Sequence, residues 1–331
     1  MRILTNFDRF PDAWVSETGQ SGSSETAKTL EDFLNGARRA DLLMINCDVG
    51  VTLRLCAAFL MRPWRRKPII AVDFVLRKPR TLSARISVWI KRLLLSRVDL
   101  FIHYFNDLSG YEKYYGIGRN RSLFVPFKPN IRYRFDPSST NEGKYLLCLG
   151  RSMRDYDTFF DAVAGLPWPA AIPAPDFPEL RRNESRFTRS LDRLPPNVTL
   201  LEDNGTEESM FRILGSAKIV VLPIRKASLC ASGVSTYLNA MLMRKCVVLT
   251  EGPGVSDVLT GQALICASED PALLASTIRK AWEDDGLRQR LEESGYRYAL
   301  SLGGEPELLQ RIIDASCRFL AQRGGNRPRT P

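Results

Sequence analysis

Short apolar runs alternate along this chain with longer segments that have helical spacing. Continuous apolar runs are typical of parallel strands that are buried on both faces, and apolar positions three and four residues apart are typical of helices. In the first part of the chain, strands are predicted at 3–7, 42–47, 68–74, 100–104 and 123–125. Helices are predicted at 27–38, 51–61, 83–96 and 109–115, and a polar loop is expected at 16–26.

The second part of the chain repeats this alternation. Strands are predicted at 145–149, 170–172, 198–201, 219–224, 246–250 and 263–266. Helices are predicted at 157–164, 207–215, 234–243, 271–283, 287–300 and 306–322. A further short helix is expected after the glycine turn at 251–254. Strands that alternate with helices predict a parallel α/β architecture.

A polar stretch at 128–143, with two prolines, separates the two parts and is the expected linker. A chain of 331 residues fits two domains of about 150 residues each. We therefore predict a Rossmann-like, acceptor-side domain at 1–135 and a second Rossmann-like domain at 144–322, both doubly wound and facing across a cleft. The segment 323–331 is rich in glycine, arginine and proline and is expected to be a disordered tail.

The composition fits a soluble globular protein, with 44% hydrophobic and 25% charged residues. No apolar run approaches the roughly 20 residues of a membrane-spanning helix, and residues 1–8 lack the apolar segment of a secretory signal. We therefore expect a cytoplasmic protein. The seven cysteines have neither metal-site nor redox spacing, so we expect reduced thiols and no metal site.

The net charge of +10 is unevenly distributed. Between residues 62 and 97, eleven basic residues stand against one acid, Asp73, which favours a polyanion or an anionic membrane surface as partner. The amphipathic segment 83–96 either packs its apolar face on the first sheet or lies on the anionic inner face of a membrane. Nucleic acid is disfavoured, because the segment has no recognition motif and no interleaved aromatic residues for base stacking.

Two loops that follow buried strands are candidate phosphate sites. Gly150 permits close backbone approach, and Arg151 and Arg154 supply fixed positive charge. The loop 232–236 opens a helix, whose free amides bind anions. Because both loops follow strands of one sheet, they are expected at the same sheet edge. The alternative for the first loop is a helix cap with its arginines in solvent.

The residues from 145 onward resemble a known family. The motifs that match are Leu147-Cys148-Leu149-Gly150-Arg151-Ser152, Asn197-Val198-Thr199-Leu200, the passage from Leu214 to Pro223, and Ser232 to Met241 followed by Cys246 to Thr250. Their order over about 180 residues is similar to that in the donor-binding domain of the retaining nucleotide-sugar glycosyltransferases of family 4. That resemblance implies the GT-B fold, in which two Rossmann-like domains face each other.

The resemblance also implies a donor site. The family residues that hold the donor diphosphate fall on Gly150, Arg151 and Arg154, with Ser152 between them. The family's glycine-rich loop falls on Ser232, Gly233, Val234, Ser235 and Thr236. Glu251, after the strand at 246–250, is either near the donor sugar or a solvated turn residue.

The sequence departs from the family at its paired glutamates, which would fall on Ala231 and Asn239. The Asn239 amide can still hydrogen-bond ribose hydroxyls, whereas Ala231 cannot replace a carboxylate.

The first part of the chain resembles the family only loosely. Asp73, where the family often has histidine, either orients an acceptor hydroxyl as a catalytic residue or caps a turn. The only histidine, His103, is expected to pack within its strand, so a Ser-His-Asp hydrolase is unsupported.

The resemblance implies a hexosyltransferase-type enzyme that transfers a sugar with retention, without a metal or other cofactor, from a nucleotide sugar to a glycan or lipid-linked acceptor in surface polysaccharide biosynthesis. Arg151 and Arg154 would then act catalytically by neutralising the departing diphosphate. The location would be cytoplasmic or peripheral on the inner face of the membrane. The missing glutamates leave open a degenerate GT-B module that serves as a partner or scaffold, and a sugar-nucleotide epimerase is a further alternative.

Overall fold

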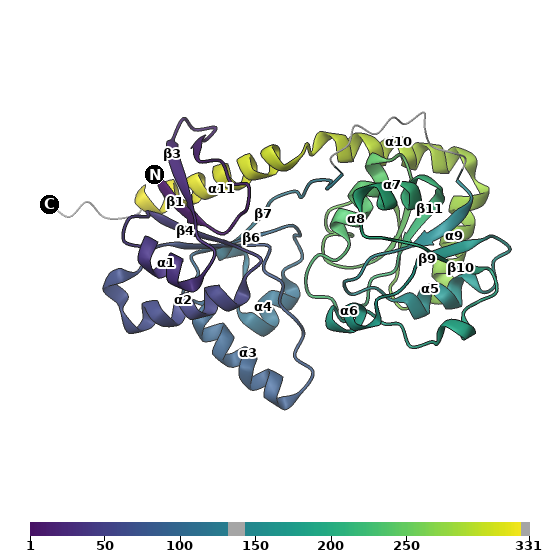
Figure 1. Ribbon diagram of the computed structural model, residues 1–331, viewed down its shortest axis with the longest axis horizontal. Coiled ribbons are helices and arrows are strands. Elements are labelled where there is room, and N and C mark those ends of the chain that lie inside the picture. The colour runs from purple at the N-terminus through teal and green to yellow at the C-terminus, as the bar shows by residue number, and fades with distance from the viewer. Residues whose placement is uncertain (132–142, 326–331) are drawn as a thin grey trace. The chain divides into compact units, whose positions relative to one another are not determined.

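The computed structural model describes residues 1–131 and 143–325. These residues form two compact units, Met1–Pro126 together with the chain from Pro306 onward, and Phe127–Glu305 (Figure 1). The expected linker at 128–143 and the expected tail at 323–331 lie partly outside the described residues. Each unit contains a mainly parallel sheet with helices beside it, so the predicted α/β class is confirmed.

The sheet of the first unit has the strand order β2-β3-β1-β4-β5-β6-β7. Its strands are β1 (Arg2–Thr5), β2 (Ala13–Val15), β3 (Ser21–Thr26), β4 (Leu42–Asn46), β5 (Ile69–Val72), β6 (Leu100–His103) and β7 (Ser122–Phe124). The helices are α1 (Leu30–Gly36), α2 (Val49–Met61), α3 (Leu82–Leu95) and α4 (Ser109–Tyr115), with 3-10 turns η1 (Pro63–Arg65) and η2 (Arg119–Arg121). All neighbouring strands are parallel except β2 and β3. The strands β5 and β6 are buried throughout, as their continuous apolar runs predict.

The predicted polar loop at 16–26 is wrong, because Ser21–Thr26 forms the strand β3 between β1 and β2. The strand is polar and partly exposed near the sheet edge, so it has no apolar alternation by which it could be recognised. Its pairing with β1 creates the strand, and the ring of Trp14 from β2 lies directly against Gly22.

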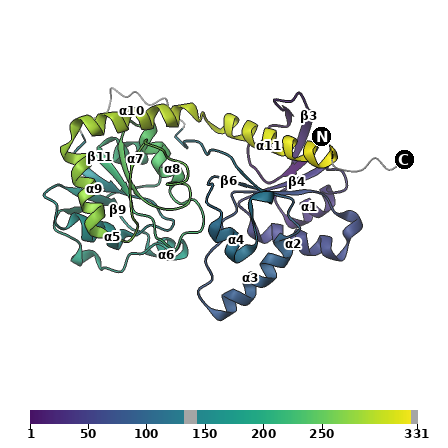
Figure 2. The ribbon, with the colours of Figure 1, turned by 180° about the vertical axis from the view of Figure 1, so that it is seen from behind.

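The last helix, α11 (Glu305–Gly325), belongs to the first unit from Pro306 onward. The side-chain amide of Gln310 donates to the Val15 carbonyl at 2.9 Å, and the Glu17 amide donates to Asp314 Oδ1 at 2.8 Å. Figures 1 and 2 both show this helix beside β1 and β3. The sequence pattern located the helix but grouped it with the second domain, because an apolar helix face does not specify which sheet it covers.

The sheet of the second unit has the strand order β10-β9-β8-β11-β12-β13, with all neighbours parallel. Its strands are β8 (Tyr145–Cys148), β9 (Ala170–Pro173), β10 (Val198–Leu201), β11 (Ala217–Leu222), β12 (Cys246–Thr250) and β13 (Leu264–Cys266). The helices are α5 (Tyr156–Val163), α6 (Phe177–Arg182), α7 (Glu207–Gly215), α8 (Val234–Leu242), α9 (Pro271–Glu283) and α10 (Asp285–Ser301), with a 3-10 turn η4 (Leu191–Arg193).

Two local expectations for this unit differ from the structure. The helix α6 was not predicted, because its proline at the second helical position made the segment look like a loop; Asp176 caps its start by accepting from the Glu179 amide at 2.9 Å. The short helix expected after 251–254 is absent, and residues 253–258 form turns instead. Asp257 Oδ1 accepts a hydrogen bond from the Gly254 amide at 2.6 Å.

Apolar side chains on opposite faces of the second sheet form two cores. Leu147, Val220 and Val247 belong to the core that includes α7 and α8. Their neighbours in sequence, Leu146 and Val221, belong to the core that includes α5 and α9. Burial on both faces fixes the strand register, so the loops after the strands leave the sheet at fixed positions.

Candidate functional site

The candidate site lies at the carboxyl ends of β8 and β11. In the sheet order β10-β9-β8-β11-β12-β13, the chain winds outward from β8 in one direction and from β11 in the other. In open parallel sheets the crevice outside such a reversal point is where ligands bind. The loop that begins at Gly150 follows β8, and the loop that leads to Gly233 follows β11, so both candidate phosphate loops belong to this edge.

Arg154 is the central side chain of the site, and its backbone is fixed from two sides. Its amide donates to Ser185 Oγ at 2.9 Å, and its carbonyl accepts from the Arg186 amide at 2.7 Å. The following amide, of Asp155, donates to the Pro223 carbonyl at 2.9 Å, at the end of β11. The arginine is therefore held between two segments of the unit.

The guanidinium of Arg154 lies between the two loop glycines. A Cβ atom built on Gly150 or on Gly233 would come closer than 3.0 Å to guanidinium nitrogens. Both glycines also have left-handed backbone, with φ of 111° and 83°, which residues with a Cβ rarely adopt. The sequence needs glycine at both positions, so that the arginine can occupy the space between the loops.

The charge of Arg154 has no carboxylate partner among the described residues. The side chain is only 1% exposed; Nε donates to the Leu149 carbonyl at 2.9 Å, whereas Nη1 has no hydrogen-bond partner. Burial lowers the pKa of this guanidinium from its ordinary value. A buried cation without a counter-ion is unfavourable, and an anionic ligand at Nη1 would supply both the missing charge and the missing hydrogen bond.

The second loop presents the start of α8 to the same guanidinium. Gly233 is the N-cap residue and provides no side-chain cap, so the first-turn amides of the nine-residue helix have no intrahelical acceptor. The loop before it is held by Ser228, whose Oγ donates to the Cys230 carbonyl at 2.8 Å and lies 3.1 Å from Ser232 Oγ. Helix-start amides next to a buried guanidinium favour a phosphate-type anion.

The other predicted residues of the first loop are more exposed. Arg151 has a side chain that is 61% exposed and pairs with Glu179 of α6 at 3.3 Å. Ser152 is exposed, and Tyr156 supports the loop by donating to the Gly150 carbonyl at 2.8 Å. Arg151 therefore lies at the solvent side of the site, whereas Arg154 lies inside it.

Asn239 and Ser235 on α8 are engaged by a residue that the sequence did not single out. The Asn130 amide donates to Asn239 Oδ1 at 2.7 Å, and its side-chain amide donates to Ser235 Oγ at 2.7 Å. Asn130 belonged to the expected linker, and no sequence motif marked it. The side-chain amide of Asn239 was expected to hydrogen-bond ribose hydroxyls, and its oxygen already accepts from the backbone amide of Asn130.

The remaining predicted residues lie around these loops. Val234 and Thr236 belong to the first turn of α8, and Ala231 packs against Gly254. Glu251 is exposed after β12, and its amide donates to the Cys266 carbonyl at 2.9 Å.

Asp73 belongs to the first unit and directly follows β5. It has a left-handed backbone with φ of 50°, and Cys47, at the end of the neighbouring β4, has φ of 55°. The Cys47 thiol donates to Asp73 Oδ2 at 3.3 Å. Burial raises the pKa of the Asp73 carboxyl, and the thiol bond partly offsets this effect. Two strained residues in contact at the carboxyl ends of adjacent strands are typical of a functional site.

The raised pKa of Asp73 predicts a pH-dependent stability difference. Above the raised pKa the fold holds an ionised carboxylate at a cost, whereas below the ordinary value of 3.8 the carboxyl is protonated in both folded and unfolded chains. The stability that the fold has with a protonated Asp73 is therefore lost as pH rises through the pKa of this carboxyl in the folded protein. Asp73→Asn is expected to unfold at higher urea concentration than the wild type at pH 8 and at the same concentration near pH 3.5. An equal difference at both pH values would contradict this.

His103 is a packed core residue, as expected. It is 1% exposed, stacks on Phe101 and lies 3.3 Å from Ser122 Oγ through Nε2. Burial lowers the pKa of His103 to about 3, so the ring is neutral at physiological pH.

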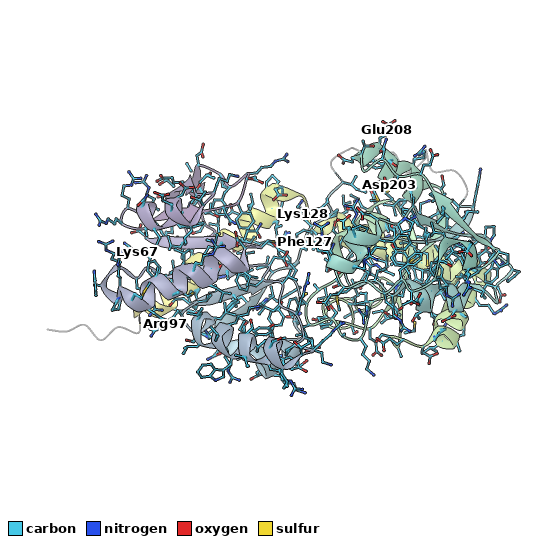
Figure 3. The ribbon with its side chains drawn as sticks, turned by 60° about the horizontal axis from the view of Figure 1, so that its bottom comes forward. Lys67, Arg97, Phe127, Lys128, Asp203 and Glu208 are labelled. Atoms are coloured by element: carbon cyan, nitrogen blue, oxygen red, sulfur yellow. The ribbon has the colours of Figure 1, made fainter. Side chains whose placement is uncertain are left out.

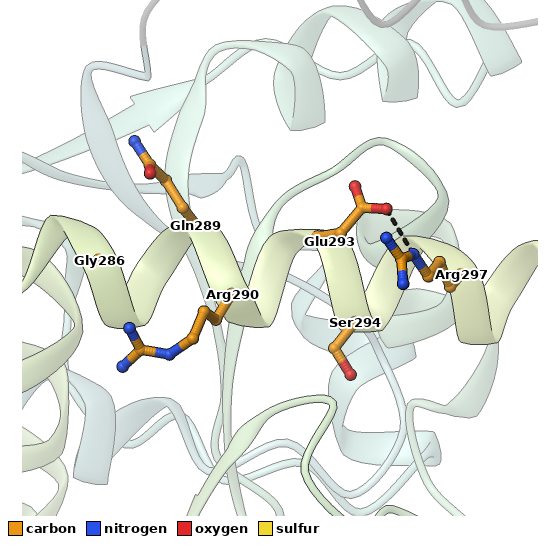
Figure 4. Close-up of a pocket in the computed structure, with 6 residues that line it drawn as sticks. All are labelled: Gly286, Gln289, Arg290, Glu293, Ser294 and Arg297. Atoms are coloured by element: carbon orange, nitrogen blue, oxygen red, sulfur yellow. Dashed lines mark hydrogen bonds and ion pairs between the residues drawn. The ribbon is translucent and has the colours of Figure 1, made fainter.

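A shallow hollow of the second unit runs along α10, away from the residues of the two loops. Figure 4 shows its lining, Gly286, Gln289, Arg290, Glu293, Ser294 and Arg297. Glu293 accepts from Arg297 Nε at 2.6 Å and is also paired with Arg244, so its charge is already balanced within the unit. The hollow shares no residue with the predicted site.

Comparison with known proteins agrees with the geometry of the second unit. Residues 174–284 match the family model described as glycosyl transferases group 1. No curated protein matches the chain in sequence.

Solved structures match both units. A sucrose-phosphate synthase from Thermosynechococcus elongatus superposes with a TM-score of 0.65 at 14% identity, over 97% of this chain and 89% of that one. HepE from Anabaena in complex with UDP gives 0.64 at 14% identity, over 90% and 86%. An α,α-trehalose 6-phosphate synthase from Burkholderia multivorans gives 0.58 at 13% identity, over 96% and 89%.

The solved structures confirm the predicted GT-B fold, with its two Rossmann-like sheets. The family match lies on the unit that carries the two phosphate loops. The solved structures thus share the fold of this chain, and the second unit is similar over residues 174–284 to glycosyl transferases group 1.

Proposed function

We propose that this protein transfers a sugar from a nucleoside-diphosphate sugar to a hydroxyl of a glycan or lipid-linked acceptor, with retention at the anomeric carbon, in surface polysaccharide biosynthesis. The observation that carries the proposal is the buried guanidinium of Arg154 between Gly150 and Gly233, which has no carboxylate partner in the described part of the chain and whose Nη1 has no hydrogen-bond partner there. A diphosphate has the charge and the acceptor oxygens that this position lacks. HepE, which shares the fold, has been solved with UDP and with UDP-glucose, and this supports a uridine diphosphate donor.

The residues on hand can stabilise the departure of the diphosphate. Negative charge grows on that group as the glycosidic bond breaks, so a fixed cation and aligned amides at its position lower the barrier. Arg154 supplies the cation, and the first-turn amides of α8 supply the donors. Both are held in place before the ligand arrives, so little reorganisation is needed. Arg151 adds positive charge from the solvent side, where water weakens its effect.

Asp73 is proposed to orient the acceptor hydroxyl. Its strained backbone and its place at the end of β5 support a functional role. A carboxyl with a raised pKa holds its proton more readily than an ordinary aspartate, so it can also donate a hydrogen bond.

A degenerate GT-B module is the second candidate, and one feature favours it. Ala231 offers no carboxylate, and Asn239 already accepts the Asn130 amide, so two positions that the family uses for the donor are altered. Such a module would act as a partner or scaffold in a polysaccharide assembly complex. It would bind a nucleotide without turnover or would not bind one.

Calorimetric titration separates these candidates. The transferase is expected to bind UDP and not uridine, because the site recognises the diphosphate, and to release UDP from UDP-sugar when an acceptor is present. Binding without release under any acceptor condition would favour the scaffold. If UDP, GDP and ADP all fail to bind, both the donor site and the transferase are excluded.

A further inference from the structure

The apolar face of α3 points to solvent instead of the core of its unit. Its exposed large side chains recur at helical spacing: Leu82 (77% exposed), Ile86 (65%), Trp89 (69%), Ile90 (49%) and Leu93 (55%). We call these residues the apolar stripe. The opposite side of the helix, with the small Ala84 and Ser87 and the buried Leu95, faces inward. Of the two alternatives for this segment, packing on the first sheet is therefore wrong for the five residues of the stripe.

The position of α3 is fixed by its neighbours, so the exposure of the stripe is a property of the folded unit. Thr81 caps the helix by accepting from the Ala84 amide at 3.1 Å. The segment before it is tied to α4, because the Leu76 amide donates to Tyr111 Oη at 2.9 Å and Tyr115 Oη donates to the Arg77 carbonyl at 2.6 Å. Contiguous apolar surface on an ordered helix marks an interaction site.

Basic residues lie beyond both ends of the apolar stripe. Exposed Arg77, Lys78 and Arg80 precede α3. Beyond its other end, Arg97 follows, and the turn η1 approaches the chain there, since Arg66 pairs with Asp99 at 2.8 Å. Figure 3 shows Lys67 and Arg97 at the same end of this unit.

The turn η1 adds apolar surface to this end. Trp64 is 77% exposed and Met61, at the end of α2, is 73% exposed. The acidic residues near this region are engaged within the unit: Asp99 is 3% exposed and accepts from the Ile69 amide at 3.0 Å, and the half-buried Asp73 accepts from the Cys47 thiol. The exposed residues of this surface are therefore mainly apolar and basic.

We propose that α3 and η1 dock this protein on an anionic membrane surface. The stripe and Trp64 would lie at the boundary between headgroups and acyl chains, where tryptophan is favoured, and the surrounding lysines and arginines would contact anionic headgroups. Charge complementarity selects a bilayer over a protein partner, because basic residues lie at both ends of an apolar helix face, as in interfacial helices. Among the described residues, no helix is long and apolar enough to span a bilayer. The inference is independent of the proposed sugar transfer.

Arg85 can contribute both apolar surface and positive charge to membrane binding. It lies four residues before Trp89 on α3, so the two side chains are neighbours on the helix surface. A long arginine stem can cover apolar surface while its charge reaches the headgroups. Arg85 therefore joins the stripe to the basic surround.

Vesicle co-sedimentation of the full chain, without donor or acceptor, tests the proposal. The wild type is expected to bind vesicles of phosphatidylcholine with phosphatidylglycerol at least about tenfold more tightly than vesicles of phosphatidylcholine alone, and rising salt is expected to weaken this binding. The triple variant Ile86→Ser/Trp89→Ser/Leu93→Ser is expected to lose about tenfold or more of the affinity. Lys78→Gln/Arg85→Gln is expected to lose most of the preference for anionic vesicles.

A matched control removes the same kind of apolar surface elsewhere. Leu191→Ser/Leu273→Ser/Leu300→Ser changes three exposed leucines of the second unit and is expected to bind vesicles like the wild type. Circular dichroism establishes that all variants are folded. The proposal is overturned if the wild type does not bind anionic vesicles, or if the stripe variant binds as the wild type does. A dimer that depends on the stripe, seen by sedimentation equilibrium without vesicle binding, would equally overturn it.

Discussion

Arg154→Met is expected to weaken UDP binding by about 100-fold or more while leaving the unliganded protein at least as stable as the wild type. The loss of affinity follows from the hydrogen bonds that the guanidinium offers to a diphosphate. Each charged hydrogen bond contributes roughly 1.5–3 kcal/mol, and about 1.4 kcal/mol corresponds to a tenfold change in affinity. Two such bonds therefore account for about 100-fold.

The expected stability has the opposite cause. In the unliganded protein Arg154 is buried with no carboxylate partner among the described residues, and Nη1 has no hydrogen-bond acceptor. Methionine removes this uncompensated charge and fills similar space, at the cost of about 1 kcal/mol for the lost bond to the Leu149 carbonyl. A site that is built for a ligand is often destabilising until the ligand arrives.

Calorimetry and thermal unfolding together check this prediction. Arg151→Met is the comparison variant, because Arg151 is exposed and pairs with Glu179; it is expected to weaken UDP binding only a few-fold. Equal losses in the two variants would mean that Arg154 has no special role. A large fall in the melting temperature of unliganded Arg154→Met would show that the arginine is structural.

Gly233→Ala is expected to impair UDP binding by roughly tenfold to 100-fold, because a Cβ at this position displaces the guanidinium of Arg154. That Cβ would lie 2.8 Å from Nη2 and 3.0 Å from Nη1. Gly150 bounds the guanidinium on the other side, so the arginine cannot move away from Gly233 in that direction. A displacement of about 1 Å is enough to misplace hydrogen bonds to a ligand.

Gly205→Ala provides a control for backbone strain. Gly205 has φ of 75°, close to the 83° of Gly233, but a Cβ there would meet nothing within 4 Å. Both variants should lose about 1–2 kcal/mol of unfolding free energy from the left-handed backbone, as measured by urea unfolding. Only Gly233→Ala should lose UDP affinity. If Gly205→Ala loses as much affinity, the effect comes from general strain and not from the contact with Arg154.

Arg154 and the glycines beside it show which parts of the site could be predicted from the sequence. Gly150 and Gly233 follow apolar strands and precede helices, so local pattern was enough to place them at loops on one sheet edge. That both glycines enclose one side chain depends on the strand order β8-β11, which brings together residues that are far apart in the chain. The pattern could not distinguish the buried Arg154 from the exposed Arg151, three positions earlier.

The structural features that the sequence did not predict involve residues with no recognisable hydrophobic pattern or motif. The strand β3 is polar because it lies near a sheet edge, and only its pairing with β1 defines it. Asn130 was read as part of a linker, yet it bonds Asn239 and Ser235. The spacing of the stripe on α3 was recognised, but periodicity shows only that a helix has an apolar face. Whether that face is buried depends on which side packs against the rest of the unit.

A crystal structure of the protein with UDP is the sharpest test of a diphosphate site at Arg154, because Nη1 is buried and has no hydrogen-bond partner within the described residues. We expect a phosphate oxygen about 2.7–3.2 Å from Nη1, with a second phosphate oxygen accepting from the first-turn amides of α8. If UDP binds elsewhere, and no ligand atom lies within hydrogen-bond distance of Nη1 near Gly150 and Gly233, Arg154 does not form a diphosphate site.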